Sequence, residues 1–354
     1  LVPTEILARQ HFASLCALMS RFSIETVLLT GSMPAAEKRR VKEAIASGEA
    51  KLILGTHALL SGDVAFQSLG LVIADEQHRF GVGQRAALAA KGRSPHLLVM
   101  SATPIPRTLA LIAYGDLDIS VVDELPPGRQ TIDTFLVGER LRQRVHAFLR
   151  RQCAEGGQAY IVCPAIEEGE LESLKSAEVW AQTLQSAVFP DLRVGLLHGR
   201  MKGAEKDAVM SAFARHELDI LVSTTVIEVG VDVPNANVMV IENADRFGLS
   251  QLHQLRGRVG RGERKSYCIL FTSSQNEETL RRLKALASTN DGFKIAEEDL
   301  KLRGPGDFFG SRQHGLPLFK AANLQLDMTV LSQAQRAAEA ALHDPGWRTD
   351  PAFA

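Results

Sequence analysis

The sequence predicts an α/β protein built on two parallel sheets, and three observations lead to that prediction. Short apolar runs rich in β-branched residues, each bounded by Gly, Asp or Pro, alternate with amphipathic stretches of helical length. The runs are apolar at consecutive positions, as in strands buried on both faces of a parallel sheet. A Pro- and Gly-rich segment, LPPGRQ at 125–130, interrupts both periodicities. The pattern therefore indicates two α/β domains in succession.

The first domain is assigned residues 1–128, with four strands and two helices. The expected strands are Thr26 to Leu29, Lys51 to Leu54, Leu69 to Ala74 and Leu97 to Ser101. The expected helices are Thr4 to Arg21 and Pro34 to Ala46. The first helix precedes the first strand and the second separates the first two strands, which is the alternation of a parallel sheet with crossover helices.

The second domain is assigned residues 129–275 and the tail residues 276–354. The expected strands of the second domain are Ala159 to Cys163, Val194 to Leu197, Ile220 to Ser223, Val238 to Ile241 and Tyr267 to Phe271. Its helices are expected at Arg140 to Cys153, Ala204 to Arg215 and Leu249 to Arg256. In the tail, helices at Glu277 to Ser288 and Leu324 to Leu342 flank a Gly-rich loop at Leu302 to Gly315.

Composition excludes several classes of protein. Hydrophobic residues make up 45% and charged residues 23% of the chain, which is typical of a globular protein. No apolar run approaches the roughly 18 residues that span a bilayer, and the start lacks the features of a secretory signal, so we expect a cytoplasmic protein. The four cysteines stand far apart without a CxxC pair, which predicts reduced, mostly buried thiols and no zinc site.

The formal net charge of -1 indicates nothing about a nucleic-acid partner. Basic residues do cluster locally, first in a predicted helix and again in the tail. The members are Arg140, Arg142, Arg144, Arg150, Arg151, Arg281, Arg282 and Lys284. Helical spacing spreads the first group around its helix, so a solvated face is expected there.

Two carboxylates follow the third expected strand directly. Asp75 and Glu76 stand where an apolar strand ends, and ligands of open α/β sheets bind at that end. Asp75 suits Mg²⁺, and Glu76 can orient and deprotonate a water for attack on a γ-phosphate. The alternative is a solvated acidic turn. After the next strand come Ser101 and Thr103, whose hydroxyls are placed to contact the two carboxylates or to cap a helix.

The strongest chemical signal lies in the second half, in QLRGRVGR at 254–261. Gln254, Arg258 and Arg261 are spaced by two glycines, so the guanidinium groups can reach into a cleft and grip phosphate oxygens bidentately. An arginine finger of this kind contributes about 10³ to 10⁵ in the rate of phosphoryl transfer. Upstream, STTVIEVGVDVP again follows a strand. There Thr224 and Thr225 can meet a nucleic-acid backbone and Asp232 a ribose or an Arg partner.

These motifs resemble those of superfamily 2 helicases. VPTEILA, GTHALL, DEQH, SATP, STTVIEVGVDVP and QLRGRVGR occur in the order and spacing of motifs Ia, Ib, II, III, V and VI. Within the superfamily, DEQHRFGVGQR, SATPIPRTLAL and the tail segment DGFKIAEEDLKLRGPGDFFGSRQHG are similar to the bacterial RecG family of DNA translocases. The resemblance implies two RecA-like domains of the P-loop NTPase type, with a C-terminal helical hairpin and loop.

The resemblance also implies ligands and partners. ATP and Mg²⁺ bind between the domains, and a monomer remodels branched double-stranded DNA such as forks and Holliday junctions in recombination and repair. Asp75 would hold Mg²⁺, Glu76 would be the general base, and Arg258 and Arg261 would contact the γ-phosphate. Further nucleotide contacts are expected from His78, Gly230 and Asp232. Contacts to DNA, or coupling to it, are expected from Pro3, Thr4, Gly55, Thr56, Ser101, Thr103, Thr224, Thr225, Arg303, Gly304, Arg312 and Gln313.

One family feature is absent from the sequence. The phosphate-binding loop GxxxxGK followed by Ser or Thr is missing, because neither Lys175 nor Lys265 follows the required Gly. We therefore expect a fragment whose first RecA-like domain is truncated at its N-terminus, which also lacks the upstream wedge domain. Without that loop, Mg²⁺·ATP loses its main anchor, and the fragment is expected to be inactive alone.

The sequence is also compatible with two other functions. The transcription-repair coupling translocase shares the tail, although the PTEILARQH and DELPPGR segments argue against it. For the fragment alone, a non-enzymatic DNA-binding module is the alternative. For the Gly-rich tail loop, the alternative to a coupling role is a loop that only caps the second domain.

Overall fold

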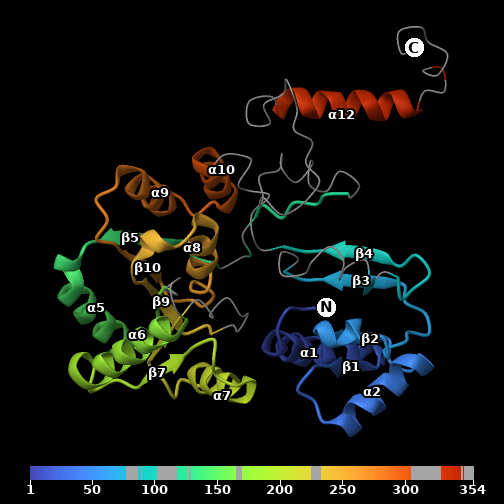
Figure 1. Cartoon of the computed structure of the whole chain (residues 1–354), viewed down its shortest axis with the longest axis horizontal. Coiled ribbons are helices and arrows are strands. Elements are labelled where there is room, and N and C mark those ends of the chain that lie inside the picture. Colours follow the sequence, from blue (N-terminus) through green and yellow to red (C-terminus); the bar gives the residue numbers. More distant parts are fainter. Residues whose placement is uncertain are drawn as a thin grey trace. The chain divides into compact units, whose positions relative to one another are not determined.

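The computed structural model describes residues 1–76, 87–88, 90–101, 118–124, 126, 129–164, 170–224, 233–303, 328–343 and 346 (Figure 1). These residues divide between two compact units, of which the first comprises 1–104 with 123–290 and the second 105–122 with 291–354. Among the described residues, no helix is long and apolar enough to cross a membrane.

The N-terminal part alternates helices and short parallel strands. Its elements in order are α1 (Glu5–Met19), η1 (Ser20–Phe22), β1 (Thr26–Leu29), α2 (Ala35–Ser47), β2 (Leu52–Gly55), η2 (His57–Leu60), β3 (Leu71–Ala74) and β4 (His96–Val99). Thr4 caps α1, because its Oγ1 accepts a hydrogen bond from the Leu7 amide at 3.4 Å. Leu29, Ile45 and Leu59 form the centre of its apolar core.

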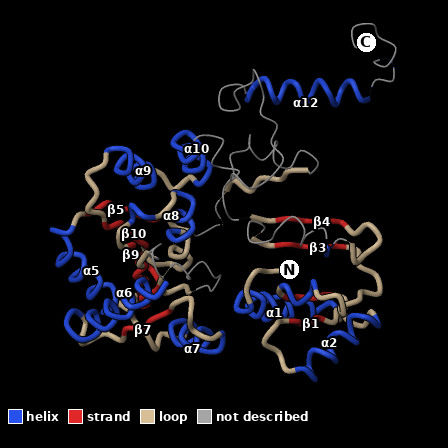
Figure 2. Tube along the Cα trace, in the orientation of Figure 1, coloured by secondary structure: helices blue, strands red, loops and turns tan. Residues whose placement is uncertain are grey.

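The four strands of this part form two parallel pairs where a single sheet was expected. β1 pairs with β2, and β3 pairs with β4 (Figure 2). The first residues of the chain link the pairs: the Val2 amide donates to Gly55 O at 3.0 Å, and the Asp75 amide donates to Leu1 O at 3.0 Å. Leu1 and Val2 make these backbone bonds but are too short to form a strand, so the two strand pairs are not joined into one sheet.

The second sheet has six strands, all parallel, in the order β5-β10-β9-β6-β8-β7. The strands are β5 (Ile132–Val137), β6 (Gln158–Val162), β7 (Val194–Leu197), β8 (Ile220–Ser223), β9 (Ala236–Ile241) and β10 (Ser266–Phe271). Every residue of β6, β8 and β9 is buried, as the consecutive apolar positions predict. The expected α/β class with parallel sheets is therefore confirmed.

Helices connect these strands and continue into the tail. They are η4 (Glu139–Leu141), α5 (Arg142–Ala154), α6 (Glu170–Thr183) with the π turn η5 (Leu184–Val188), α7 (Gly203–Ala214), η7 (Ala244–Arg246), α8 (Leu249–Arg256), α9 (Glu277–Ser288), α10 (Gly292–Arg303) and α12 (Met328–His343). β5, α6 and α10 were not predicted from the sequence. The helix expected from Leu324 begins at Met328 within the described residues, and the Gly-rich loop from 304 onward lies outside them.

The cysteines behave as expected. All four are free, with Cys153 and Cys268 buried and Cys16 and Cys163 partly buried. Burial raises the pKa of the Cys153, Cys163 and Cys268 thiols to about 12, so these three are neutral at physiological pH.

Candidate functional site

The acidic pair lies directly beyond β3. Asp75 Oδ1 accepts a hydrogen bond from the Glu76 amide at 2.8 Å, and Asp75 Oδ2 lies 3.4 Å from His11 Nε2 of α1. The Met100 amide donates to Ala74 O at 2.8 Å, so Ser101, just past β4, emerges beside the carboxylates. The backbone pairing of β3 with β4 therefore brings the residues after the two strands, Asp75 and Ser101 among them, next to each other, as expected.

Glu76 has a backbone conformation that is uncommon for a side-chain-bearing residue. Its φ is 52°, in the left-handed region. Such a conformation costs on the order of 1 kcal/mol or more and is found disproportionately at functional sites. The turn away from the strand therefore begins at the proposed base itself. His78 and Thr103, which were expected nearby, lie outside the described residues.

A second group of predicted residues lies where β1 and β2 end. The Thr56 amide donates to Leu29 O at 3.3 Å and closes the chain around Gly55. Gly55 has no room for a side chain, because a Cβ there would lie 2.3 Å from Leu29 O. Since the Val2 amide also bonds to Gly55 O, the segment with Pro3 and Thr4 comes next to Gly55 and Thr56.

The predicted arginines occupy the end of α8. This helix stops at Arg256, and Gly257 follows as its C-cap, accepting hydrogen bonds from Arg129 at 3.3 Å and from Arg261 Nε at 3.4 Å. Gly260 has a φ of 79°, which turns the chain between Arg258 and Arg261. Arg258 is partly exposed and Arg261 is exposed, in contrast to the buried Arg256 of the same motif.

The remaining predicted residues are described only in part. Thr224 follows β8, is buried, and donates from its amide to Leu197 O at 3.3 Å. Arg303 ends α10. Thr225, Gly230, Asp232, Gly304, Arg312 and Gln313 lie outside the described residues.

Arg256 is a residue whose role the sequence analysis missed. It stands in the same motif as Arg258 and Arg261, yet it is only 2% exposed. Its guanidinium donates to Leu286 O at 2.7 Å and to Thr289 O at 2.8 Å, and so satisfies carbonyls at the end of α9. Burial lowers the pKa of this group below its ordinary value. The motif thus holds α8 and α9 together as well as presenting exposed arginines.

The prediction that the basic residues of α5 form a solvated face is wrong for Arg142. Its guanidinium makes a bidentate ion pair with Glu242, at 2.8 and 2.9 Å, and lies 4.3 Å from the centre of the Phe271 ring. The carboxylates of Glu242 and Glu139 raise its pKa above the ordinary value. The partner is 100 positions away in the sequence, so helical spacing alone gives no sign of it.

Comparisons with known proteins agree with these strand-end motifs. The chain matches the model of the DEAD/DEAH box helicases over residues 1–112 and that of the helicase conserved C-terminal domain over 140–263. A third model, described as ATP-dependent DNA helicase RecG, domain 3, C-terminal, matches 289–353.

The relatives of similar sequence given below are longer than this chain. The ATP-dependent DNA helicase RecG of Synechocystis is 52% identical over 99% of this chain and 42% of the relative. That of Bacillus subtilis is 48% identical over 100% of this chain and 52% of the relative. A solved structure of RecG bound to a three-way DNA junction is 50% identical, with a TM-score of 0.74, over 94% of this chain and 43% of that one.

Fold, motifs and family models together place the chain in the superfamily 2 helicase class. Within that class, the near-complete coverage at about half identity shows that the chain belongs to the RecG family. The chain spans about half the length of the curated relatives it matches. The resemblance inferred from the sequence is therefore confirmed.

Proposed function

We propose that this chain is the motor portion of an ATP-dependent double-stranded DNA translocase that remodels branched DNA in recombination and repair. One observation carries the proposal: about half of all residues are shared, over nearly the whole chain, with relatives named ATP-dependent DNA helicase RecG. A relative that is 50% identical in sequence was solved bound to a three-way DNA junction. The partner DNA is a fork or Holliday junction, and the protein acts as a monomer.

ATP and Mg²⁺ are the cofactors of this proposal. The carboxylate of Asp75 at a strand end is the hard oxygen donor that Mg²⁺ accepts alongside nucleotide phosphates. Glu76 orients and deprotonates the attacking water, and Gln254 lies on α8 near the motif arginines. Arg258 and Arg261 stabilise the charge that develops on the transferred phosphoryl group. His78, Gly230 and Asp232 complete the nucleotide contacts.

The other strand-end residues contact the DNA. Backbone contacts come from Pro3, Thr4, Gly55, Thr56, Ser101, Thr103, Thr224 and Thr225, residue types whose hydroxyls or short side chains suit contacts with phosphates. Arg303, Gly304, Arg312 and Gln313 of the tail couple motor closure to movement along the duplex. Functionally, residues 1–128 and 129–275 act as the two motor domains and 276–354 as the coupling tail.

The proposal is tested by Glu76→Gln in the full-length protein. ATP hydrolysis stimulated by synthetic forked DNA should fall by about 10² to 10⁴, because the base is removed, while binding of forked DNA is retained. Glu49→Gln, an exposed carboxylate on the surface, is the matched control and should hydrolyse ATP normally.

Normal ATP hydrolysis by the Glu76→Gln variant would show that Glu76 is not the general base. Absence of DNA-stimulated hydrolysis in the unaltered full-length protein, with DNA binding intact, would favour a non-enzymatic DNA-binding module.

A further inference from the structure

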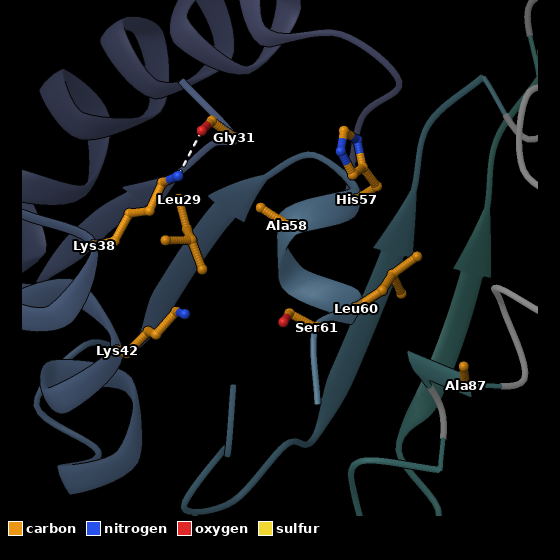
Figure 3. A pocket seen from close by; sticks show the side chains of 9 residues that line it. All are labelled: Leu29, Gly31, Lys38, Lys42, His57, Ala58, Leu60, Ser61 and Ala87. Atoms are coloured by element: carbon orange, nitrogen blue, oxygen red, sulfur yellow. Dashed lines mark hydrogen bonds between the residues drawn. The ribbon is translucent and has the colours of Figure 1, made fainter. Parts of the chain in front are cut away.

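An open groove of about 640 Å³ lies beside the ends of β1 and β2 (Figure 3). One wall is α2, from which Lys38 reaches toward Gly31 just past β1, while Lys42 lies one turn further along the helix. The opposite wall is η2, with His57 at its start and Ser61 at its end. Both walls follow directly from the carboxyl ends of parallel strands, the edge where α/β sheets bind ligands.

The groove carries an excess of positive charge. The Lys38 ammonium donates to the backbone carbonyl of Gly31 at 2.5 Å, a neutral partner that leaves its charge uncompensated. Lys42 forms an ion pair with Asp63, and Lys91 donates to Ser61 O at 2.6 Å. Asp63 forms the ion pair with Lys42 and also acts electrostatically on the nearby Lys91, whereas Lys38 donates to a neutral carbonyl.

The loop that carries Gly31 is held in place from α1. The Ser32 amide and hydroxyl both donate to the carboxylate of Glu5, the amide at 2.9 Å. Gly31 itself is closely approached, because a Cβ there would lie 3.2 Å from Glu5 Oε1. The carbonyl that restrains Lys38 is therefore fixed by the helix that follows Pro3 and Thr4, and the groove opens beside Thr56 through its neighbour His57.

We propose that this groove binds a phosphodiester of the DNA backbone, with Lys38 as its principal contact and His57 beside it. The inference rests on the proposed function and adds a binding position that lies on α2 and η2. Lysine is a flexible point charge, which suits a phosphate and reads no base sequence. On binding, Lys38 exchanges a bond to a neutral carbonyl for a bond to an anionic phosphate oxygen, in which both partners carry charge.

The test compares Lys38→Gln with Arg40→Gln in the full-length protein. Both variants remove one positive charge from α2, but Arg40 is exposed and does not line the groove. Affinity for synthetic forked DNA is measured across about 50 to 200 mM salt. Losing one phosphate contact should make the slope of log K against log salt shallower by about 0.9 in Lys38→Gln. Arg40→Gln should keep the slope of the unaltered protein.

Lys38→Arg serves as the second variant, since it keeps the charge and should restore the steep slope. Equal slopes for Lys38→Gln and Arg40→Gln would overturn the groove assignment. DNA-stimulated ATP hydrolysis by the unaltered protein is measured in parallel: its absence would count against the proposed function, whereas its presence with equal slopes would count against the groove alone.

Discussion

Three arginines within six residues of one motif have different surroundings. Arg256 lies on the last turn of α8 and is buried against the end of α9, whereas Arg258 and Arg261 follow the helix and are accessible. The sequence analysis identified the two accessible arginines from the glycines between them. It could not identify the third, because the carbonyls that Arg256 satisfies belong to Leu286 and Thr289, some thirty positions later.

Replacing Arg256 should destabilise the fold. Arg256→Ala removes the guanidinium bonds to the buried carbonyl of Leu286 and the partly buried carbonyl of Thr289, so we expect the free energy of unfolding to fall by about 2 to 4 kcal/mol. Urea unfolding measures this loss. Arg281→Ala, an exposed arginine on α9, should change stability by less than about 0.5 kcal/mol. A similar small change in Arg256→Ala would show that water replaces the guanidinium.

The elements themselves were largely predictable because burial on both faces produces consecutive apolar residues. β7, β8, α8 and α9 have the bounds that the pattern predicts. β5 was missed because its sequence, IDTFLV, mixes polar and apolar residues directly after the Pro- and Gly-rich segment. The strand order was not predictable either, since β5 pairs with β10, its partner more than 100 residues away in sequence.

Arg142 and Glu242 join two elements of the second sheet domain. Arg142 begins α5, and Glu242 follows β9 at its carboxyl end. The side chains are only 21% and 12% exposed, so the pair is partly desolvated. Water screens it less than an ion pair on the surface, and the loss of one partner leaves the other charge poorly solvated. The pair therefore fixes the start of α5 to the strand end that leads into α8.

A double-mutant cycle measures this contact. Arg142→Ala and Glu242→Ala should each lower the free energy of unfolding by about 2 to 3 kcal/mol, less than a fully buried pair because Arg142 stays partly exposed. Their coupling energy should be about 1 to 3 kcal/mol. Arg144→Ala on the exposed side of α5 is the control. Additive losses in the double variant would mean that Arg142 stabilises α5 through the Phe271 contact instead.

At the scale of the whole chain, the two sheet regions differ in how well they are covered. In the six-stranded sheet, β6, β8 and β9 are buried along their full length. On the β3–β4 pair, one face exposes Leu71 at 54% and Leu98 at 48%, together with Ile73 and Met100. Parallel sheets are normally covered on both faces, and two-stranded sheets are marginal by themselves. Local stability should therefore be unequal along the chain.

Native-state hydrogen exchange of this chain tests that inequality. The amides of β6, β8 and β9 should open only with global unfolding of their domain, because each strand is paired on both sides. The amides of β3 and β4 should exchange at least about ten-fold faster, since one pair of strands with an exposed apolar face opens locally at lower free energy. Ile73→Thr, which makes the exposed face more polar, should leave the exchange of β6 unchanged. Equal protection of β3 and β6 would show that the N-terminal strands unfold only together with the six-stranded sheet, and the stability of the molecule would then be a single cooperative quantity.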